Sequence, residues 1–189
     1  MVCLGRDGRI IKMVSFIKLV QKRISNISIG PSTLRGQPTG TINLTREFLK
    51  SFDLNIFNNT LSESDFLNKL DEQTNLLKEK IHSKSWGIAR KALNIFLFQS
   101  SHDIFLSKEY GLNKIIPFLE VPLDNPNAKK LVEMAEQKGI KLRWNNIKSL
   151  IKEDSYNLQK FAKQVSNEEY NCDRCYLDLY FWRGNKVEE

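Results

Sequence analysis

Apolar side chains recur at helical spacing through most of the chain. The first such stretch is residues 12–25, and its apolar face consists of Val14, Ile17, Leu19, Val20 and Ile24. Lysine and arginine side chains occupy the rest of its circumference, so the pattern predicts an amphipathic helix. A longer helix is predicted for residues 62–80, with Ser62 as its N-cap. Its expected apolar face is Phe66, Leu67, Leu70, Leu76 and Leu77.

The same periodicity predicts the remaining elements. Further helices are expected at residues 43–52, 88–109, 127–138 and 155–169. Gly111 and Gly139 follow two of these helices and are expected to end them, while the Gly- and Pro-rich residues 28–40 form a connector. We assign residues 175–184 to a helix as well, because no other part of the chain offers a sheet to join.

These elements predict an all-α fold, a compact two-lobed helical bundle. We expect residues 1–189 to form a single domain, with a flexible start over residues 1–12 and Met13 as an alternative first residue. The chain has 41% hydrophobic and 27% charged residues, which is typical of a soluble globular protein and excludes a disordered one.

The charge is strongly and unevenly positive. The formal net charge is +7, and residues 129–152 carry seven Lys/Arg against two acids. Such an excess favours a polyanionic partner, because cations that neutralise phosphates release condensed counterions. The alternative is a solvated, lysine-rich surface without a nucleic-acid partner.

The sequence does not indicate a metal site, a disulfide framework or a membrane protein. The three cysteines are Cys3, Cys172 and Cys175, and no histidine stands at ligand spacing to the last two, so we interpret this pair as structural or incidental. No apolar run is long enough to span a bilayer, and we find no targeting signal. We therefore expect a cytoplasmic monomer, associated with the nucleoid in a prokaryote, without metal, cofactor or membrane contact.

Three segments resemble the helix-hairpin-helix DNA glycosylases. Residues 87–97, GIARKALNIFL, are similar to the second helix of that family's hairpin, and Val121-Pro122-Leu123-Asp124 is similar to its segment with the catalytic aspartate. Residues 34–39, LRGQPT, resemble a turn whose glutamine fills the gap left by an extruded base. The long connection between Lys91 and Asp124 is closest to the archaeal 8-oxoguanine branch.

The resemblance implies specific roles for these residues. Lys91 would be the nucleophile that attacks the sugar and forms a Schiff base, and Asp124 would stabilise the positive charge on that sugar. The expected DNA contacts are Arg35, Gln37, Gly87, Ala89 and Arg90. Among these, Gly87 would let a phosphate approach the start of the helix, and Arg90 would help to keep Lys91 neutral. Ala89 replaces the second glycine of the family's hairpin.

Aromatic residues and one acid are candidates for a base pocket. These residues are Trp86, Phe118, Trp144, Asp178 and Trp182. An aromatic ring can stack on an extruded base, and a carboxylate can accept a hydrogen bond from its edge. Two of them also have a simpler interpretation: Trp86 as core, and Asp178 as a solvent-facing residue or a partner of Arg174 or Arg183. The simpler interpretation of Asp124 is a helix cap.

The sequence therefore predicts a DNA glycosylase with AP lyase activity. Its expected partner is double-stranded DNA with a damaged base, with 8-oxoguanine favoured and a modified pyrimidine as the alternative. Two other classes stay open: a non-catalytic helical protein that binds DNA or RNA, and an interaction module whose basic surface meets an acidic protein. Only the glycosylase requires Lys91 and Asp124 to lie close together.

Overall fold

Helices dominate the computed structural model, which describes residues 2–4, 10–12 and 15–183. The α-helices are α1 (Phe16–Ser28), α2 (Thr41–Lys50), α3 (Glu63–Lys80), α4 (Trp86–His102), α5 (Ile104–Tyr110), α6 (Asn125–Gln137), α7 (Lys152–Glu169) and α8 (Leu177–Arg183). Three short 3₁₀ segments join them, namely η1 (Leu54–Phe57), η2 (Leu112–Phe118) and η3 (Arg174–Tyr176). The all-α prediction is confirmed.

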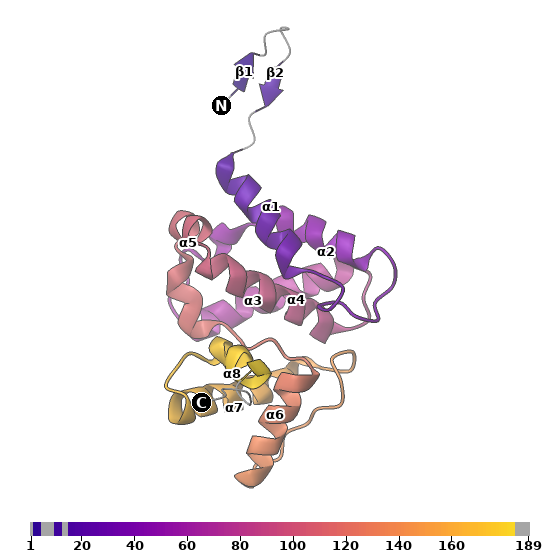
Figure 1. Cartoon of the computed structure of the whole chain (residues 1–189), viewed down its shortest axis with the longest axis vertical. Coiled ribbons are helices and arrows are strands. Elements are labelled where there is room, and N and C mark those ends of the chain that lie inside the picture. Colours follow the sequence, from indigo (N-terminus) through magenta and orange to yellow (C-terminus); the bar gives the residue numbers. More distant parts are fainter. Residues whose placement is uncertain (1, 5–9, 13–14, 184–189) are drawn as a thin grey trace.

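One departure lies at the start of the chain. Two three-residue strands, β1 (Val2–Leu4) and β2 (Ile10–Lys12), pair antiparallel in the segment for which we expected no regular structure. This pair precedes α1 and extends away from the helices in Figure 1.

Local signals place most helix ends where the sequence predicts them. The Ser62 side chain accepts a hydrogen bond from the Asp65 amide, which confirms it as the N-cap of α3. Gly111 and Gly139 adopt left-handed backbone angles at the ends they were expected to mark. The single helix expected over residues 88–109 is wrong, because Asp103 divides it: its carboxylate caps α5 through the Phe105 and Leu106 amides.

Buried apolar side chains form two clusters. The larger one unites α1 to α5 with η1 and η2 around residues such as Phe57, Phe66 and Phe96. The smaller one unites α6, α7 and the start of α8 around Leu131 and Leu158. Figure 1 shows the corresponding two lobes, with α6, α7 and α8 below the other helices. Leu19 and Leu76, which we expected on buried faces, are both half-exposed.

A candidate active site between the two lobes

The Lys91 ammonium and the Asp124 carboxylate lie close together at the junction of the lobes. Lys91 is in the second turn of α4, in the larger lobe, whereas Asp124 is the N-cap of α6, in the smaller one. The distance from Lys91 Nζ to Asp124 Oδ2 is 3.5 Å, and the two side chains are 13% and 33% exposed. The pair is therefore shielded from bulk water and still reachable.

Helix α6 fixes the orientation of the aspartate. Its Oδ1 atom accepts a hydrogen bond from the Asn127 amide at 3.2 Å, which satisfies one of the free N–H groups of the first turn. The other carboxylate oxygen is the one that faces Lys91. Capping and the contact with lysine thus use different oxygens of one side chain, and the N-cap interpretation of Asp124 is confirmed alongside the pairing.

A second acid, Asp178 in α8, lies beside this pair. The Asn127 side-chain amide donates to Asp178 Oδ1 at 2.6 Å and to the Pro122 carbonyl at 2.8 Å. Burial raises the pKa of the Asp178 carboxyl, and the hydrogen bond from Asn127 offsets part of this shift. The charges of Asp124 and Lys91 also act on it, in opposite directions. One interpretation of the sequence paired Asp178 with Arg174. The structure describes both residues and shows no such pair.

The start of α4 is covered by protein, which contradicts the expected phosphate contact at Gly87. A methyl group built on the Gly87 Cα would lie 2.5 Å from the Ile147 carbonyl oxygen and 2.8 Å from Leu150 Cβ. The Ser85 hydroxyl caps α4 by accepting from the Ile88 amide, and it donates to the same Ile147 carbonyl. Gly87 is thus needed for close packing against the segment before α7.

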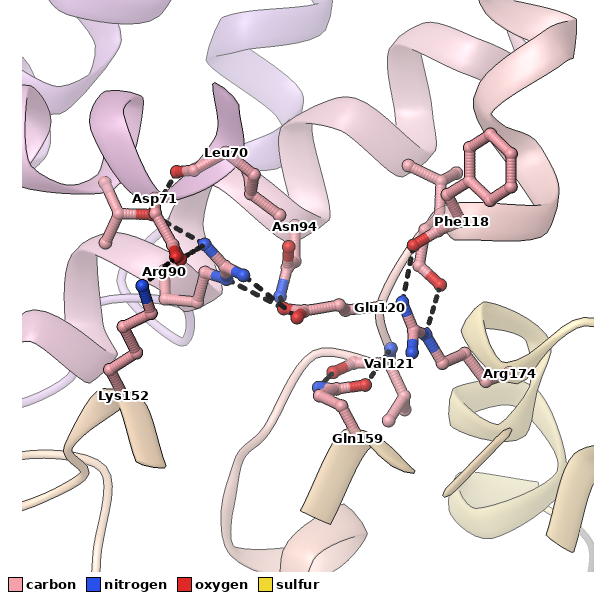
Figure 2. A network of polar contacts seen from close by, with 12 residues as sticks. Leu70, Asp71, Arg90, Asn94, Phe118, Glu120, Val121, Lys152, Gln159 and Arg174 are labelled. Carbon is pink, nitrogen blue, oxygen red and sulfur yellow. Dashed lines mark hydrogen bonds and ion pairs between the residues drawn. The ribbon is translucent and has the colours of Figure 1, made fainter. Parts of the chain in front are cut away.

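Ala89 and Arg90 are also buried and are unavailable as DNA contacts. The Arg90 guanidinium forms two parallel hydrogen bonds with Glu120, at 2.8 and 2.9 Å, and contacts Asp71 at 2.8 Å (Figure 2). Because two carboxylates neutralise it, Arg90 does not supply the free positive charge expected beside Lys91. The prediction for these two residues is therefore wrong.

Glu120 is the centre of this buried network and was not singled out from the sequence. Burial alone would raise the pKa of the Glu120 carboxyl, but the charge and hydrogen bonds of Arg90 outweigh it and hold that pKa below its usual range. Asn94 adds a hydrogen bond at 2.9 Å to one of its oxygens. The signal in the sequence was one acid inside the apolar run PFLEVPL.

A second buried arginine ties the connector after η2 to the smaller lobe. Arg174 donates to the Phe118 carbonyl at 2.7 Å and to the Leu119 carbonyl at 3.0 Å, as Figure 2 shows. Gln159 of α7 holds the same connector through both backbone groups of Val121. Both side chains therefore hold the segment that leads to Asp124.

The predicted gap-filling turn lies at the surface beside the same segment that covers Gly87. Arg35 is exposed and Gln37 is half-buried. Between them, Gly36 has a left-handed backbone, and a methyl group built on it would lie 3.6 Å from Lys148 Nζ. The Lys148 side chain therefore lies beside this turn.

The expected aromatic pocket is not assembled as a unit. Trp144 lies near the site, since its Nε1 donates to the Asn125 side chain at 3.3 Å, one residue after Asp124. Phe118 packs near Phe66 in the core of the larger lobe, with ring centroids 6.3 Å apart. Trp86 stacks on Arg90, whose guanidinium carbon is 5.0 Å from the ring centroid. The Trp182 side chain lies outside the described residues.

Comparisons with known proteins add no relative. No family model matches the chain, and no curated protein and no solved structure matches it either. Within the described part of the chain, no helix is long and apolar enough to cross a membrane. The same residues contain no group of three His, Cys, Asp or Glu side chains arranged to hold a metal ion.

Proposed function

We propose that the protein is a base-excision DNA glycosylase with an associated lyase activity, and that Lys91 is its nucleophile. The observation that carries the proposal is the contact between Lys91 and Asp124, at 3.5 Å across the junction of the lobes. Neither side chain needs this partner to complete its helix, since Lys91 lies in mid-helix and Asp124 caps α6 with its other oxygen.

The geometry suits attack of an amine on a sugar carbon. Asp124 Oδ2 accepts a proton from the Lys91 ammonium, which frees the nitrogen electron pair. That pair forms a bond to C1′ while the bond from C1′ to the base breaks. The base leaves with the electrons and takes up the proton that Asp124 received from Lys91, so Asp124 becomes a carboxylate again. As it gives up this proton, the Asp124 carboxylate stabilises the positive charge that develops on the sugar. The bond from C1′ to O4′ then breaks as a proton passes from the nitrogen to O4′, which gives a Schiff base. Loss of a proton from C2′ eliminates the 3′ phosphate.

In this proposal, Asp178 contacts the extruded base. It is half-buried, it belongs to α8, and it reaches the site through Asn127, which neighbours the cap of α6. A carboxyl held in such surroundings is a hydrogen-bond partner for a ring N–H of a purine, and Trp144 supplies a nearby aromatic surface. An oxidised purine such as 8-oxoguanine, the substrate that the family resemblance implies, carries such an N–H.

The surface around the turn at residues 34–37 is the expected DNA contact. Arg35 and Lys148 lie there, and Lys141 and Arg143 are exposed on the segment that precedes Lys148. Binding through such side chains releases counterions, so the affinity for duplex DNA is expected to fall steeply with salt. Gln37 is the side chain of this turn that would enter the space left by the extruded base.

Borohydride trapping tests this function. Labelled duplexes with 8-oxoguanine, thymine glycol, uracil or an abasic site are mixed with protein and reduced, and a covalent band is expected for at least one of them. Lys91→Gln abolishes the band, Asp124→Asn weakens it strongly, and Lys84→Gln is the matched control because it alters an exposed lysine just before α4.

The outcomes separate the proposal from its rivals. Duplex binding without any band, abasic DNA included, would indicate the non-catalytic nucleic-acid-binding protein instead. An absence of salt-dependent DNA binding, together with binding to an acidic protein, would indicate the interaction module.

A further inference from the structure

A cavity of about 570 Å³ lies between α3, the start of α4 and α7. Its wall includes Trp86 and Arg90 from α4, and Ser155, Tyr156 and Lys160 from α7. Lys91 does not line it, because a helix directs residues 86 and 90 to one face and residue 91 to another. The size falls within the usual range for sites that bind small molecules, roughly 300–1,000 Å³.

Cations outnumber carboxylates around this cavity. Its three acids are all engaged: Glu63 with Lys163 and Arg174, Asp71 with Lys152 and Arg90, and Glu120 with Arg90. Lys160 also lines the cavity, is exposed, and has no ion pair among the described residues. The lining therefore has five cations against three carboxylates, and this surplus favours an anion.

One buried polar group points to a ligand. The Ser155 side chain is 2% exposed, and its hydroxyl has no hydrogen-bond partner among the described residues. Leaving a buried hydroxyl unpaired is costly, and its position in the cavity wall allows a bound molecule to satisfy it. Ser155 lies in the first turn of α7, whose N-cap residue provides no side-chain cap. The two acids of the same turn, Glu153 and Asp154, are not part of the cavity lining.

The cavity also offers aromatic surface beside these charges. Both Trp86 of α4 and Tyr156 of α7 line it; Trp86 is half-buried, and Tyr156 is 57% exposed. Aromatic side chains next to lysines and a free hydroxyl are the groups that recognise a planar base attached to a phosphate. An inorganic anion alone would leave the aromatic surface unused.

From this arrangement we infer a second binding site, distinct from Lys91 and Asp124, for a nucleotide. Its base lies against Trp86 and Tyr156, and its phosphate contacts Lys160 and the Ser155 hydroxyl. The site does not depend on the proposed glycosylase activity, because its lining contains neither Lys91 nor Asp124. The nucleotide can be free or can belong to a single strand of DNA, and both carry the same groups.

Titration calorimetry with the whole chain tests this site. The probes are dGMP, deoxyguanosine, inorganic phosphate and a short single-stranded oligonucleotide. We expect dGMP to bind more tightly than deoxyguanosine or phosphate. Lys160→Gln and Tyr156→Ala each weaken binding about tenfold, the loss expected for one charged hydrogen bond or one stacking contact. Both residues are exposed, so these variants keep the fold.

Two controls make the result decisive. Lys129→Gln removes an exposed lysine on α6, and Lys91→Gln removes the proposed nucleophile; neither changes dGMP binding if the site is correct.

Binding of the oligonucleotide alone, with the same dependence on Lys160 and Tyr156, assigns the site to a DNA strand. Absence of binding by every probe would overturn the proposal. Binding that is insensitive to Lys160→Gln and Tyr156→Ala, or that is lost in Lys91→Gln, would also overturn it.

Discussion

Lys91 Nζ and Asp124 Oδ2 are 3.5 Å apart, although the residues come from different lobes and are joined by a long connection. Specific contacts bring Asp124 to Lys91. Arg174 and Gln159 hold the backbone of the connection, and Asp124 is fixed as a helix cap. The short distance is therefore a property of the packed interface between the lobes, and disturbing that interface should disturb the site.

Replacing Gly87 with alanine is expected to destabilise the protein by about 1–3 kcal/mol, the usual cost of forcing an extra methyl group into a packed interior. The methyl group would meet the Ile147 carbonyl and Leu150 Cβ, which belong to the segment before α7. Urea unfolding measures the change. Gly30→Ala is the matched control, because a methyl group there meets nothing within 4 Å; equal losses in both variants would contradict the packing role of Gly87.

Glu120→Gln is expected to cost about 3–5 kcal/mol of unfolding free energy, because it leaves the Arg90 charge buried without its main partner. The double variant Arg90→Met/Glu120→Leu should lose less than Glu120→Gln alone, since it removes both charges. Chemical unfolding of the single and double variants at pH 7 measures this. A double variant less stable than the single one would show that the pair itself supports the fold.

Acid should act on the same network. The pKa of Glu120 lies below that of an unfolded glutamate, near 4.5, so the ionised pair stabilises the fold above that pH. Its contribution is lost as the pH falls through the lower, folded-state pKa. Unfolding free energy measured from pH 7 down to pH 3 should therefore drop less in the double variant than in the wild type. The same pH dependence of the unfolding free energy in both proteins would contradict this role of Glu120.

Asp178→Asn is expected to stabilise the protein at neutral pH, and to lower the proposed excision activity. Burial raises the pKa of Asp178 above its ordinary value of 3.8, so the ionised carboxylate is less favourable in the folded state than in the unfolded chain. Removing the charge should gain stability, within the roughly 0.5–2 kcal/mol of a typical stabilising substitution. The gain should vanish below pH 3.8, where both forms are neutral; a destabilised variant at pH 7 would contradict the argument.

Cys175 is expected to resist alkylation in the folded protein. Burial raises the pKa of its thiol to about 12, and Cys175 is buried, whereas Cys172 is half-buried. In a Cys3→Ser background, iodoacetamide at pH 8 should label Cys172 before Cys175, and peptide mass spectrometry after a short reaction measures the order. Equal labelling of the two thiols without denaturant would contradict the buried position of Cys175.

Short-range signals explain which parts of the fold could be predicted. The caps at Ser62, Gly111 and Gly139 act on neighbouring residues, so the sequence alone reveals them. The division at Asp103 was missed because apolar residues continue at helical spacing on both sides, and only the hydrogen bonds of its carboxylate interrupt the helix.

The site was harder, because its contacts are long-range. Gly87 packs against Ile147 and Arg90 pairs with Glu120, and no local pattern links residues so far apart in the chain. Periodicity did not place Lys91 beside Asp124 either; the family resemblance did. The remaining part of the predicted site, the aromatic pocket, failed for two residues. Phe118 packs near Phe66, and Trp86 contacts Arg90 and lines the other cavity, away from Lys91.

Locating the covalent bond after trapping tests the account most directly. An abasic duplex is reduced with borohydride in the presence of the whole chain, the adduct is digested with protease and nuclease, and the modified peptide is sequenced by mass spectrometry. The account predicts the remnant of the sugar on Lys91, and no trapped product from Lys91→Arg, which keeps the positive charge but lacks the nucleophilic amine. An adduct on another lysine, with Lys91→Arg still trapped, would contradict it.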